Sequence, residues 1–327
     1  MRVLVADRLP ETHVAALEER HVVTYEPSLA SGDLPSAIGE HEALVVRSTQ
    51  VRSDCLDAAT HLRLVLRAGA GTDTIDVTSA GERGIAVCNL PGRNAVAVAE
   101  LAMGLLLAID RRIPDQVRDL RDGVWRKGHY ASGSRGIAGR SVGIAGLGQI
   151  GLAFAARLTA FEANVFSVGS PRRDAERQQR AESLGIRFVD DFEALAEACD
   201  VLSFHLPSVA STRAVIGQPL LSHVQPGTII LNTSRGDLVD APALLAELEP
   251  RDLYVGLDVY PDEPSAPEAE FASELARHPR VYGTHHVGAS TAQAQEAVAD
   301  GVVELLEAFE RGERPHCVNE DLLRTHA

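Results

Sequence analysis

The sequence predicts an α/β fold built around parallel β-sheets. Short runs rich in Val, Ile and Leu alternate with Ala-, Leu-, Glu- and Arg-rich segments of helical period, and this alternation is typical of βαβ units. Hydrophobic residues make up 45% of the chain and charged residues 24%, which allows a sizeable apolar core. The 327 residues are about twice the ~150 of a typical domain, so two domains are expected.

A first series of strands lies in the N-terminal third. The strands are expected at Val3–Ala6, Val22–Tyr25, Ala43–Arg47, Leu64–Arg67 and Ile85–Cys88. Helical stretches such as Glu11–Glu19 separate them. A long helix follows at about Ala95–Ile109, and its small residues suit close packing between two domains or two subunits. The next segment, Asp110–Arg140, is polar.

A second series of strands begins at residue 141. These strands are expected at Ser141–Ala145, Asn164–Val168, Arg187–Val189, Val201–His205, Thr228–Asn232, Tyr254–Asp258 and Val281–Thr284. This is enough for a full doubly wound parallel sheet, so a separate α/β unit must precede it. A last helix is expected at Ala292–Arg311.

Net charge and lysine content exclude several kinds of partner and chemistry. The formal charge of −15 repels nucleic acid and anionic membranes, so neither is an expected partner. No run of about 18 apolar residues is present to span a bilayer. The sequence contains a single lysine, Lys127, and no Gly-Lys-Ser/Thr, which excludes a Walker phosphate-binding loop.

Cysteine spacing and the N-terminus predict a cytoplasmic protein without a bound metal. The N-terminal apolar run ends at Asp7, which is too short for a signal peptide. The four cysteines are far apart, with no Cys-x-x-Cys and no zinc-ligand spacing. They are Cys55, Cys88, Cys199 and Cys317. We expect them to be reduced and structural.

A glycine motif opens the second series of strands. Gly146-Leu147-Gly148-Gln149-Ile150-Gly151 fits G-x-G-x-x-G between the strand Ser141–Ala145 and the helical stretch Leu152–Leu158. The first glycine allows a tight turn, the second lets the backbone approach a pyrophosphate, and the third lets helix pack on strand. The motif predicts dinucleotide binding, with an S-adenosylmethionine-dependent methyltransferase as the alternative.

The next strand lacks the carboxylate that usually binds the ribose hydroxyls of NAD. It ends in Gly169-Ser170-Pro171-Arg172-Arg173. A hydroxyl and two guanidinium groups instead suit a 2′-phosphate, so Ser170, Arg172 and Arg173 favour NADP(H), with NAD(H) as the alternative. The competing interpretation is that these arginines form a solvated helix face.

Three later strands are each followed by polar residues at the sheet edge where α/β proteins bind ligands. Arg235 follows the first of them, Glu263 the second, and His285 and His286 the third. Taken singly, a structural ion pair or a core histidine would explain each residue.

These segments resemble the D-isomer-specific 2-hydroxyacid dehydrogenase family. The resemblance covers nearly the whole chain. Within the family, the sequence is most similar to the phosphoglycerate dehydrogenases. It rests on Arg67–Asp73, Asn89–Gly92, Ala99–Leu101, the glycine motif, His205–Pro207 and the three segments just described. It implies a Rossmann-like dinucleotide-binding domain at 96–287, inserted into a flavodoxin-like substrate domain formed by 1–95 and 288–327.

By position, the resemblance implies that Arg235, Glu263 and His286 are catalytic. An arginine fork can bind the carboxylate or carbonyl oxygen of a 2-oxo acid, and His286 would exchange a proton with the carbonyl oxygen as hydride reaches C2. Glu263 would hold His286 and favour its charged form. The family usually has proline where this chain has His285. His286 is preferred because its distance to Gly288–Thr291 matches.

The resemblance also implies cofactor and substrate contacts. The expected cofactor contacts are Gly146, Gly148, Gln149, Ile150, Gly151, Ser170, Arg172, Arg173, His205, Pro207, Thr212, Ser234, Asp258 and His286. The expected substrate contacts are Arg47, Arg67, Ala70, Gly71 and Arg235. Arg47 and Arg67 have an alternative interpretation as surface charges, and Arg47 opens a motif that is one residue short of the family pattern.

The expected substrate is a small anionic 2-oxo or 2-hydroxy acid. The leading pair is 3-phosphoglycerate and 3-phosphohydroxypyruvate, with glyoxylate or hydroxypyruvate reduction as the alternative. A dinucleotide-sensing corepressor is the non-enzymatic alternative. A homodimer is expected through the long helix and the segment around Trp125, and no C-terminal regulatory domain is expected after Ala327.

Overall fold

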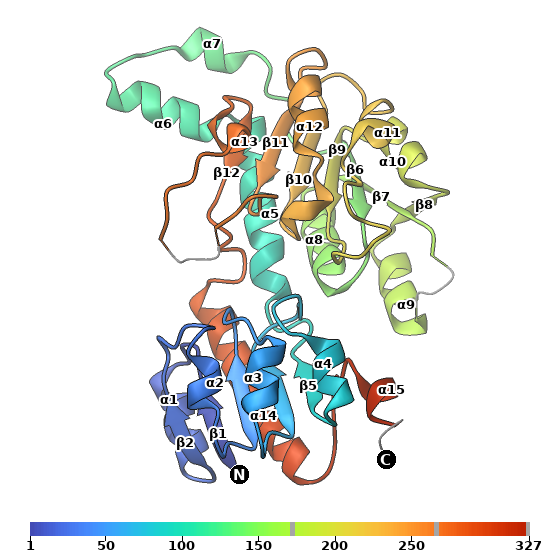
Figure 1. Cartoon of the computed structure of the whole chain (residues 1–327). Coiled ribbons are helices and arrows are strands. Elements are labelled where there is room, and N and C mark those ends of the chain that lie inside the picture. The colour runs from blue at the N-terminus through green and yellow to red at the C-terminus, as the bar shows by residue number, and fades with distance from the viewer. Residues whose placement is uncertain (171–173, 265–267, 325–327) are drawn as a thin grey trace. The chain divides into compact units, whose positions relative to one another are not determined.

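The computed structural model describes residues 1–170, 174–264 and 268–324, and the chain divides into two compact units (Figure 1). Unit 1 combines Met1–Asn94 with Ser290–Ala327, and unit 2 is Ala95–Ala289. The boundaries expected from the sequence, 1–95 with 288–327 and 96–287, differ from these by one or two residues. Both ends of the chain thus belong to the same unit.

Unit 1 is built on a five-stranded sheet of order β2-β1-β3-β4-β5 in which neighbouring strands are parallel. Its strands are β1 (Arg2–Val5), β2 (Val22–Tyr25), β3 (Ala43–Val46), β4 (Leu64–Arg67) and β5 (Ala86–Asn89). Its helices are α1 (Glu11–Glu18), α2 (Leu34–Ala37), α3 (Ser53–Ala58), α4 (Val77–Glu82), α14 (Ala292–Glu310) and α15 (Glu320–Leu323). This order is that of a flavodoxin-like doubly wound sheet, as predicted.

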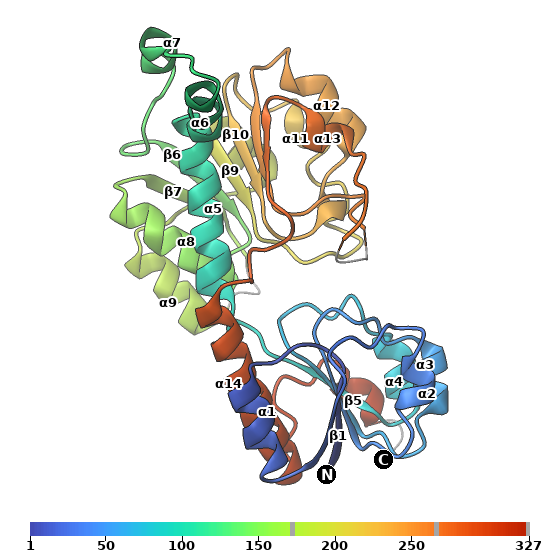
Figure 2. The ribbon, with the colours of Figure 1, turned by 90° about the vertical axis from the view of Figure 1, so that its left-hand side faces the viewer.

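Successive strand residues in unit 1 enter two different apolar layers, as the two-residue period of a strand requires. Val3 and Val5 pack with α1 and α14, whereas Leu4 packs with α2, α3 and α4. Figure 2 shows α1 and α14 side by side on one face of the sheet and the three shorter helices on the other. Both faces of the sheet are therefore covered, which explains why its strands read as continuous apolar runs.

Unit 2 is built on a seven-stranded sheet of order β12-β11-β10-β9-β6-β7-β8, again with parallel neighbours. Its strands are β6 (Ser141–Ala145), β7 (Asn164–Val168), β8 (Arg187–Val189), β9 (Val201–Phe204), β10 (Ile229–Asn232), β11 (Tyr254–Leu257) and β12 (Val281–Gly283). The strand order reverses between β6 and β9. In such sheets a ligand binds at this switch point, beyond the carboxyl ends of the strands.

Helices cover both faces of the seven-stranded sheet (Figure 2). The elements are α5 (Ala95–Asp110), α6 (Ile113–Arg121), α7 (Lys127–Ala131), α8 (Gln149–Ala160), α9 (Ala175–Ser183), α10 (Phe192–Ala198), α11 (Gln218–Leu221), the 3-10 helix η1 (Gly236–Leu238), α12 (Ala241–Leu248) and α13 (Glu274–Arg277). Helices α5 and α8 pack on one face, where Phe154 is fully buried, and α10 to α13 pack on the other.

Two helices lie where the sequence predicted only a polar segment. Helices α6 and α7 both fall within Asp110–Arg140, and neither contains a buried residue. Within the described residues, no helix is long and apolar enough to cross a membrane.

Candidate active site

The glycine motif forms the turn between β6 and α8. Gly146 has φ of 99°, and a Cβ atom there would lie 2.5 Å from the carbonyl oxygen of His205. A Cβ atom on Gly151 would overlap the carbonyl oxygen of Gly146. The space beside Gly148 is open, because a Cβ atom there would meet no heavy atom within 4 Å. Two glycines thus let the backbone pack closely, and the third leaves room for a ligand.

The N-terminus of α8 fits the phosphates of a dinucleotide. Gly148 is the N-cap residue, no side chain caps the helix, and its first turn contains no acidic residue. No carboxylate of the first turn therefore lies beside the amides of Gln149 and Ile150. The positive end of the helix dipole favours the binding of an anionic ligand there. These features suit the pyrophosphate expected from the motif.

The described end of β7 carries no carboxylate. The Gly169 amide donates to the Val189 carbonyl at 3.0 Å, and Ser170 is exposed. Asp174, the next acid along the chain, caps α9 by accepting from the Arg177 amide at 2.8 Å. Arg172 and Arg173, the expected 2′-phosphate contacts, lie outside the described residues.

His205 lies at the carboxyl end of β9, beside the glycine turn. Its ring packs on Phe154, with 5.4 Å between ring centroids, and its Nε2 lies 2.9 Å from the Ser203 hydroxyl. Burial lowers the pKa of His205 to about 4, so its ring is neutral at physiological pH. The Thr212 hydroxyl donates to the Pro207 carbonyl at 2.6 Å, which holds the exposed Pro207 loop.

Arg235 is held at the carboxyl end of β10 by Asn232. The Asn232 side chain is fully buried. Its Nδ2 atom donates to the Arg235 carbonyl at 2.8 Å, and its Oδ1 atom accepts from the Ser234 hydroxyl at 2.7 Å. A Cβ atom on Gly236 would overlap the Tyr260 carbonyl. The Arg235 turn therefore packs directly against the loop that carries Glu263. Asn232 is not among the site residues expected from the sequence, although a buried amide side chain at a strand end is a recognisable signal.

Glu263 and His286 form a hydrogen-bonded pair. The Glu263 Oε1 atom lies 2.8 Å from the His286 Nδ1 atom. This hydrogen bond raises the pKa of His286 above its ordinary value, while burial and the Arg235 charge act in the opposite direction. Burial acts to raise the pKa of Glu263, but the hydrogen bond and charge of His286 outweigh it, so the pKa is lowered. The pair thus favours a charged imidazolium beside a carboxylate.

Asp258 fixes the turn on which His286 lies. Its carboxylate is only 1% exposed and accepts from the Thr284 hydroxyl at 2.6 Å and the Val287 and Gly288 amides at 2.9 and 2.8 Å. Its carbonyl accepts from the His286 amide at 2.8 Å. These bonds hold His286 in a left-handed conformation, with φ of 52°, that costs energy for a residue with a side chain. Asp258, expected from the sequence to contact the cofactor, here positions His286.

The neighbouring histidine has different contacts. Both histidines are exposed, but only the His286 ring has a hydrogen-bond partner among the described residues. Of the two adjacent histidines, His286 is therefore the one that lies beside Glu263.

Four of the expected substrate contacts lie in unit 1, at the end of β4 or on the loops after β3 and β4, and the fifth, Arg235, lies in unit 2. The amides of Arg47, Ser48 and Thr49 all donate to the Asp7 carboxylate, at 2.6, 3.0 and 3.1 Å. The Arg67 guanidinium lies over Gly69, where a Cβ atom would overlap its Nη1 atom.

The loop that contains Ala70 and Gly71 is tied to β5. The Asn89 side chain donates to the Ala70 carbonyl, and the Leu90 amide donates to the Gly69 carbonyl at 2.9 Å. Because β3, β4 and β5 are parallel neighbours, their carboxyl ends place these loops at one edge of the five-stranded sheet.

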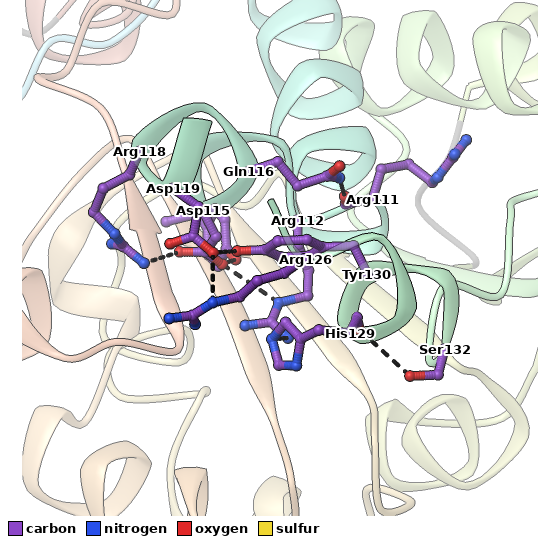
Figure 3. Close-up of polar contacts among 11 residues, drawn as sticks. Arg111, Arg112, Asp115, Gln116, Arg118, Asp119, Arg126, His129, Tyr130 and Ser132 are labelled. Atoms are coloured by element: carbon purple, nitrogen blue, oxygen red, sulfur yellow. Dashed lines mark hydrogen bonds and ion pairs between the residues drawn. The ribbon is translucent and has the colours of Figure 1, made fainter. Parts of the chain in front are cut away.

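Helices α6 and α7 form an arm of unit 2 that is held together by polar contacts (Figure 3). The Tyr130 hydroxyl donates to Asp119 at 2.7 Å, and Arg126 pairs with the same carboxylate at 3.6 Å. The Arg112 guanidinium lies 5.4 Å from the Tyr130 ring centroid. The apolar side chains of this arm face solvent instead: Ile113, Val117, Leu120 and Trp125 are exposed, the last at 77%.

Comparison with known proteins places the chain in a family. The doubly wound sheet and the glycine turn are typical of dinucleotide-binding proteins. A family model described as D-isomer specific 2-hydroxyacid dehydrogenase, NAD binding domain, matches residues 103–288. The chain belongs to the D-isomer specific 2-hydroxyacid dehydrogenase family, which confirms the resemblance seen in the sequence and decides against a methyltransferase.

Individual relatives agree with this placement. The chain is 37% identical over 307 residues to the hydroxypyruvate reductase of Thermotoga maritima, covering 93% of this chain and 96% of the relative. It is 36% identical over 317 residues to a D-3-phosphoglycerate dehydrogenase of Methanocaldococcus jannaschii, covering 96% of this chain but only 58% of the relative. The chain thus spans about three fifths of that relative's length. A glyoxylate reductase structure from Paecilomyes thermophila matches with a TM-score of 0.85 and 28% identity, covering 98% of this chain and 99% of that one.

Proposed function

We propose that the protein is an oxidoreductase that transfers a hydride between a nicotinamide cofactor and a D-2-hydroxy acid/2-oxo acid pair. The observation that carries this proposal is the 2.8 Å contact between Glu263 Oε1 and His286 Nδ1, next to the Arg235 turn. An imidazolium held at one nitrogen by a carboxylate keeps its second N–H for a substrate oxygen. The names of the relatives, two reductases and a dehydrogenase of 2-hydroxy acids, support the same reaction.

Each member of the group has a separate task in the proposed reaction. A nicotinamide cofactor, when bound, would supply or accept the hydride of the reaction. The Arg235 guanidinium binds the carboxylate or carbonyl oxygen and orients the acid. His286 donates its Nε2 proton to the carbonyl oxygen during reduction, or removes the hydroxyl proton during oxidation. Glu263 and Asp258 orient the ring, because they hold its Nδ1 atom and its backbone.

In this proposal the glycine turn binds the dinucleotide. Arg47, Arg67 and the amides of Ala70 and Gly71 are the proposed contacts for the acid. Two guanidinium groups suit a substrate with a second anionic group, so 3-phosphohydroxypyruvate/3-phosphoglycerate is the preferred pair. Glyoxylate or hydroxypyruvate reduction is the alternative, which the names of two relatives support.

A substrate panel tests the reaction. We expect NAD(P)H oxidation with 3-phosphohydroxypyruvate, with a kcat/KM above those for glyoxylate and hydroxypyruvate, and a D-configured product. A higher kcat/KM for hydroxypyruvate would replace the phosphorylated substrate by the alternative one. Absence of turnover with all of these acids, in protein that binds the cofactor, would contradict the enzymatic proposal.

For the cofactor, we favour NADP(H) over NAD(H). The support is the absence of a carboxylate at the described end of β7, together with Ser170 and the arginines that follow in the sequence. A Cβ atom on Gly169 would meet only the Val189 carbonyl, at 3.7 Å, so Gly169→Asp can be accommodated. We expect the wild type to prefer NADPH and Gly169→Asp to shift the kcat/KM ratio toward NADH, because a carboxylate repels the 2′-phosphate. A wild-type preference for NADH would contradict this part of the proposal.

We also propose that the protein is a homodimer joined through the α6–α7 arm. The arm presents Ile113, Val117 and Leu120 at helical spacing on one exposed side. Near its base, unit 2 contains a cavity of about 510 Å³ with apolar walls that include Leu101, Leu105 and Val281. A two-fold dimer would place the exposed side chains of each arm against the cavity of the other chain.

Light scattering on the purified protein tests the dimer. We expect the wild type at twice the mass of one chain and Leu120→Glu at the mass of one chain. Phe161→Glu is the matched control, since Phe161 is an exposed apolar residue of unit 2 outside the arm, and it is expected to leave the mass unchanged. A monomeric wild type would contradict the proposal.

A further inference from the structure

The segment that follows α14 pairs with the edge of the five-stranded sheet. Strand β5 is an edge strand, and Cys317 forms an antiparallel bridge with Cys88 on it. The Val318 amide donates to the Val87 carbonyl at 2.8 Å, and the Asn89 amide donates to the His316 carbonyl at 3.4 Å. The C-terminal segment therefore pairs with β5 through one isolated antiparallel bridge at the edge of the sheet.

Asn319 fixes this pairing with both ends of its side chain. Its carbonyl oxygen accepts from the Val87 amide at 2.9 Å, and its amide nitrogen donates to the Ile85 carbonyl at 2.9 Å. The side chain is almost fully buried, so these hydrogen bonds are shielded from water. The register between β5 and the C-terminal segment is thereby fixed at Cys88 and Cys317.

The hydrogen-bond pattern brings the two cysteines close together. The bonds connect the residues on either side of Cys88 and Cys317 and not the cysteines themselves, which makes them a non-hydrogen-bonded pair. In such a pair the Cα atoms lie about 4.5 Å apart and the side chains are closest. Disulfides span Cα separations of about 4.4–6.8 Å. The Cys317 thiol donates to the Asn319 side-chain oxygen at 3.3 Å, which holds Cys317 beside this register.

We infer that Cys88 and Cys317 are an oxidative modification site, at which a peroxide converts the two thiols into a disulfide that ties the C-terminal segment to β5. The other two cysteines lie in different surroundings. Cys55 is buried beside Asp54, and Cys199 is buried beside Asp200. The paired geometry distinguishes Cys88 and Cys317 from these.

The two thiols differ in exposure, and this sets the order of the steps. Cys317 is partly exposed, whereas Cys88 is fully buried, and burial raises the pKa of the Cys88 thiol to about 12. The Cys317 thiolate attacks a peroxide oxygen, the O–O bond breaks, and hydroxide leaves as the sulfenic acid forms. The Cys88 sulfur then attacks the Cys317 sulfur and loses its proton, the S–O bond breaks, and water leaves. One peroxide is reduced to two waters as the two thiols are oxidised.

The disulfide would join the two chain segments that make up unit 1. Cys88 belongs to Met1–Asn94 and Cys317 to Ser290–Ala327. A cross-link between residues so far apart in sequence restricts the unfolded chain strongly. We therefore expect the oxidised protein to melt about 5–10 °C above the reduced protein.

Peptide mapping after mild oxidation tests the inference. Reduced protein is treated with hydrogen peroxide, blocked with an alkylating reagent and digested. We expect a peptide pair linked through Cys88 and Cys317 that lacks the mass of two hydrogen atoms and separates on reduction. Cys199→Ala is the matched control and should still form the linked pair. Cys317→Ser should form no linked pair and should lose the Tm difference between oxidised and reduced protein.

Three outcomes would contradict the proposed disulfide or its stabilising effect. Oxidation of Cys317 to sulfinic acid without a linked peptide, or a disulfide to a different cysteine, would overturn the inference. A linked pair whose formation leaves the Tm unchanged would overturn the stabilising role. Because Cys317 is partly exposed, circular dichroism of Cys317→Ser checks that its fold is intact, and none of these readouts depends on enzymatic activity.

Discussion

The two sheets share a doubly wound, parallel design but use their glycines and charges differently. In unit 2, Gly146 and Gly151 allow backbone to pack against backbone, which leaves an open space beside Gly148 at the start of a helix. In unit 1, Gly69 lies under the guanidinium of Arg67 from the same loop. One sheet end therefore offers backbone amides to a phosphate, and the other offers a side-chain cation.

In the proposed mechanism, the same topology therefore supports two kinds of recognition, and the proton-transfer group belongs to the seven-stranded sheet. Arg235, Glu263 and His286 all follow strands of the seven-stranded sheet. Substitutions in unit 2 should therefore alter kcat or cofactor binding, whereas those in unit 1 should alter KM and substrate preference. Five variants test this division, described from the largest expected effect to the smallest.

Removal of the proposed acid should have the largest effect. His286→Ala should lower kcat by about 10²–10⁴-fold, the usual contribution of general acid–base catalysis, while the cofactor Kd changes little. His285→Ala is the matched control and should retain most of the activity. Steady-state kinetics and cofactor titration measure both. A fully active His286→Ala would transfer the role to another group.

Glu263→Gln should lower kcat/KM by about 100-fold, because the ring loses its orienting carboxylate. It should also change the pH dependence. The hydrogen bond to Glu263 raises the pKa of His286, so its loss lowers that pKa. Reduction needs the protonated ring, and its rate should therefore begin to fall at lower pH than in the wild type. Oxidation needs the neutral ring, so the increase of the oxidation rate with rising pH should begin at lower pH than in the wild type.

The pH dependence of kcat/KM in both directions measures this effect. A profile for Glu263→Gln that coincides with that of the wild type would show that Glu263 does not control the titration of His286.

Gly148→Ala and Gly151→Ala separate ligand space from packing space. A Cβ atom on Gly148 meets nothing within 4 Å, so its variant should keep the wild-type Tm but bind the dinucleotide about tenfold more weakly, a loss of about 1.4 kcal/mol. A Cβ atom on Gly151 overlaps backbone, so its variant should lose about 1–3 kcal/mol or more of stability. Calorimetry and thermal melting distinguish the two. Equal effects on Tm would contradict the separation.

Arg67→Ala should have the smallest effect. We expect kcat/KM for the phosphorylated substrate to fall about fivefold relative to hydroxypyruvate, the size of a partly exposed charge pair, mainly through KM. Arg63→Ala is the control, because Arg63 lies in the same unit with its guanidinium over Phe309. An unchanged preference in Arg67→Ala would remove the argument for a phosphorylated substrate.

The strands and the catalytic cluster were accessible from the sequence because each depends on local patterns. Largely apolar runs such as Ser141–Ala145 and Asn164–Val168 match the observed strands residue for residue, since burial on both faces of the sheet favours apolar side chains along the strand. Helix α6 escaped prediction because it buries no residue in its own unit. Its few apolar residues alternate with charged ones, so the sequence predicted a polar segment and no helix.

The supporting contacts of the site were less accessible. The sequence indicated Arg235 and His286, but it did not reveal that Asn232 holds the first or that Asp258 positions the second. These contacts depend on which strands are neighbours, and the Asp258 amide donates to the Asn232 carbonyl at 3.0 Å only because β10 and β11 pair. The proximity of Cys88 and Cys317 likewise arises from a long-range pairing that no local pattern records.

The division of unit 1 between the two ends of the chain has a consequence for the order of folding during synthesis. The apolar face formed by Val3, Val5 and Leu66 is covered by α14, which emerges from the ribosome after all of unit 2. Unit 2 is continuous and can fold as soon as it has been made. Until α14 emerges, the five-stranded sheet has only α1 on that face, so we expect it to be the last part of the protein to fold and the part most prone to aggregate on the way.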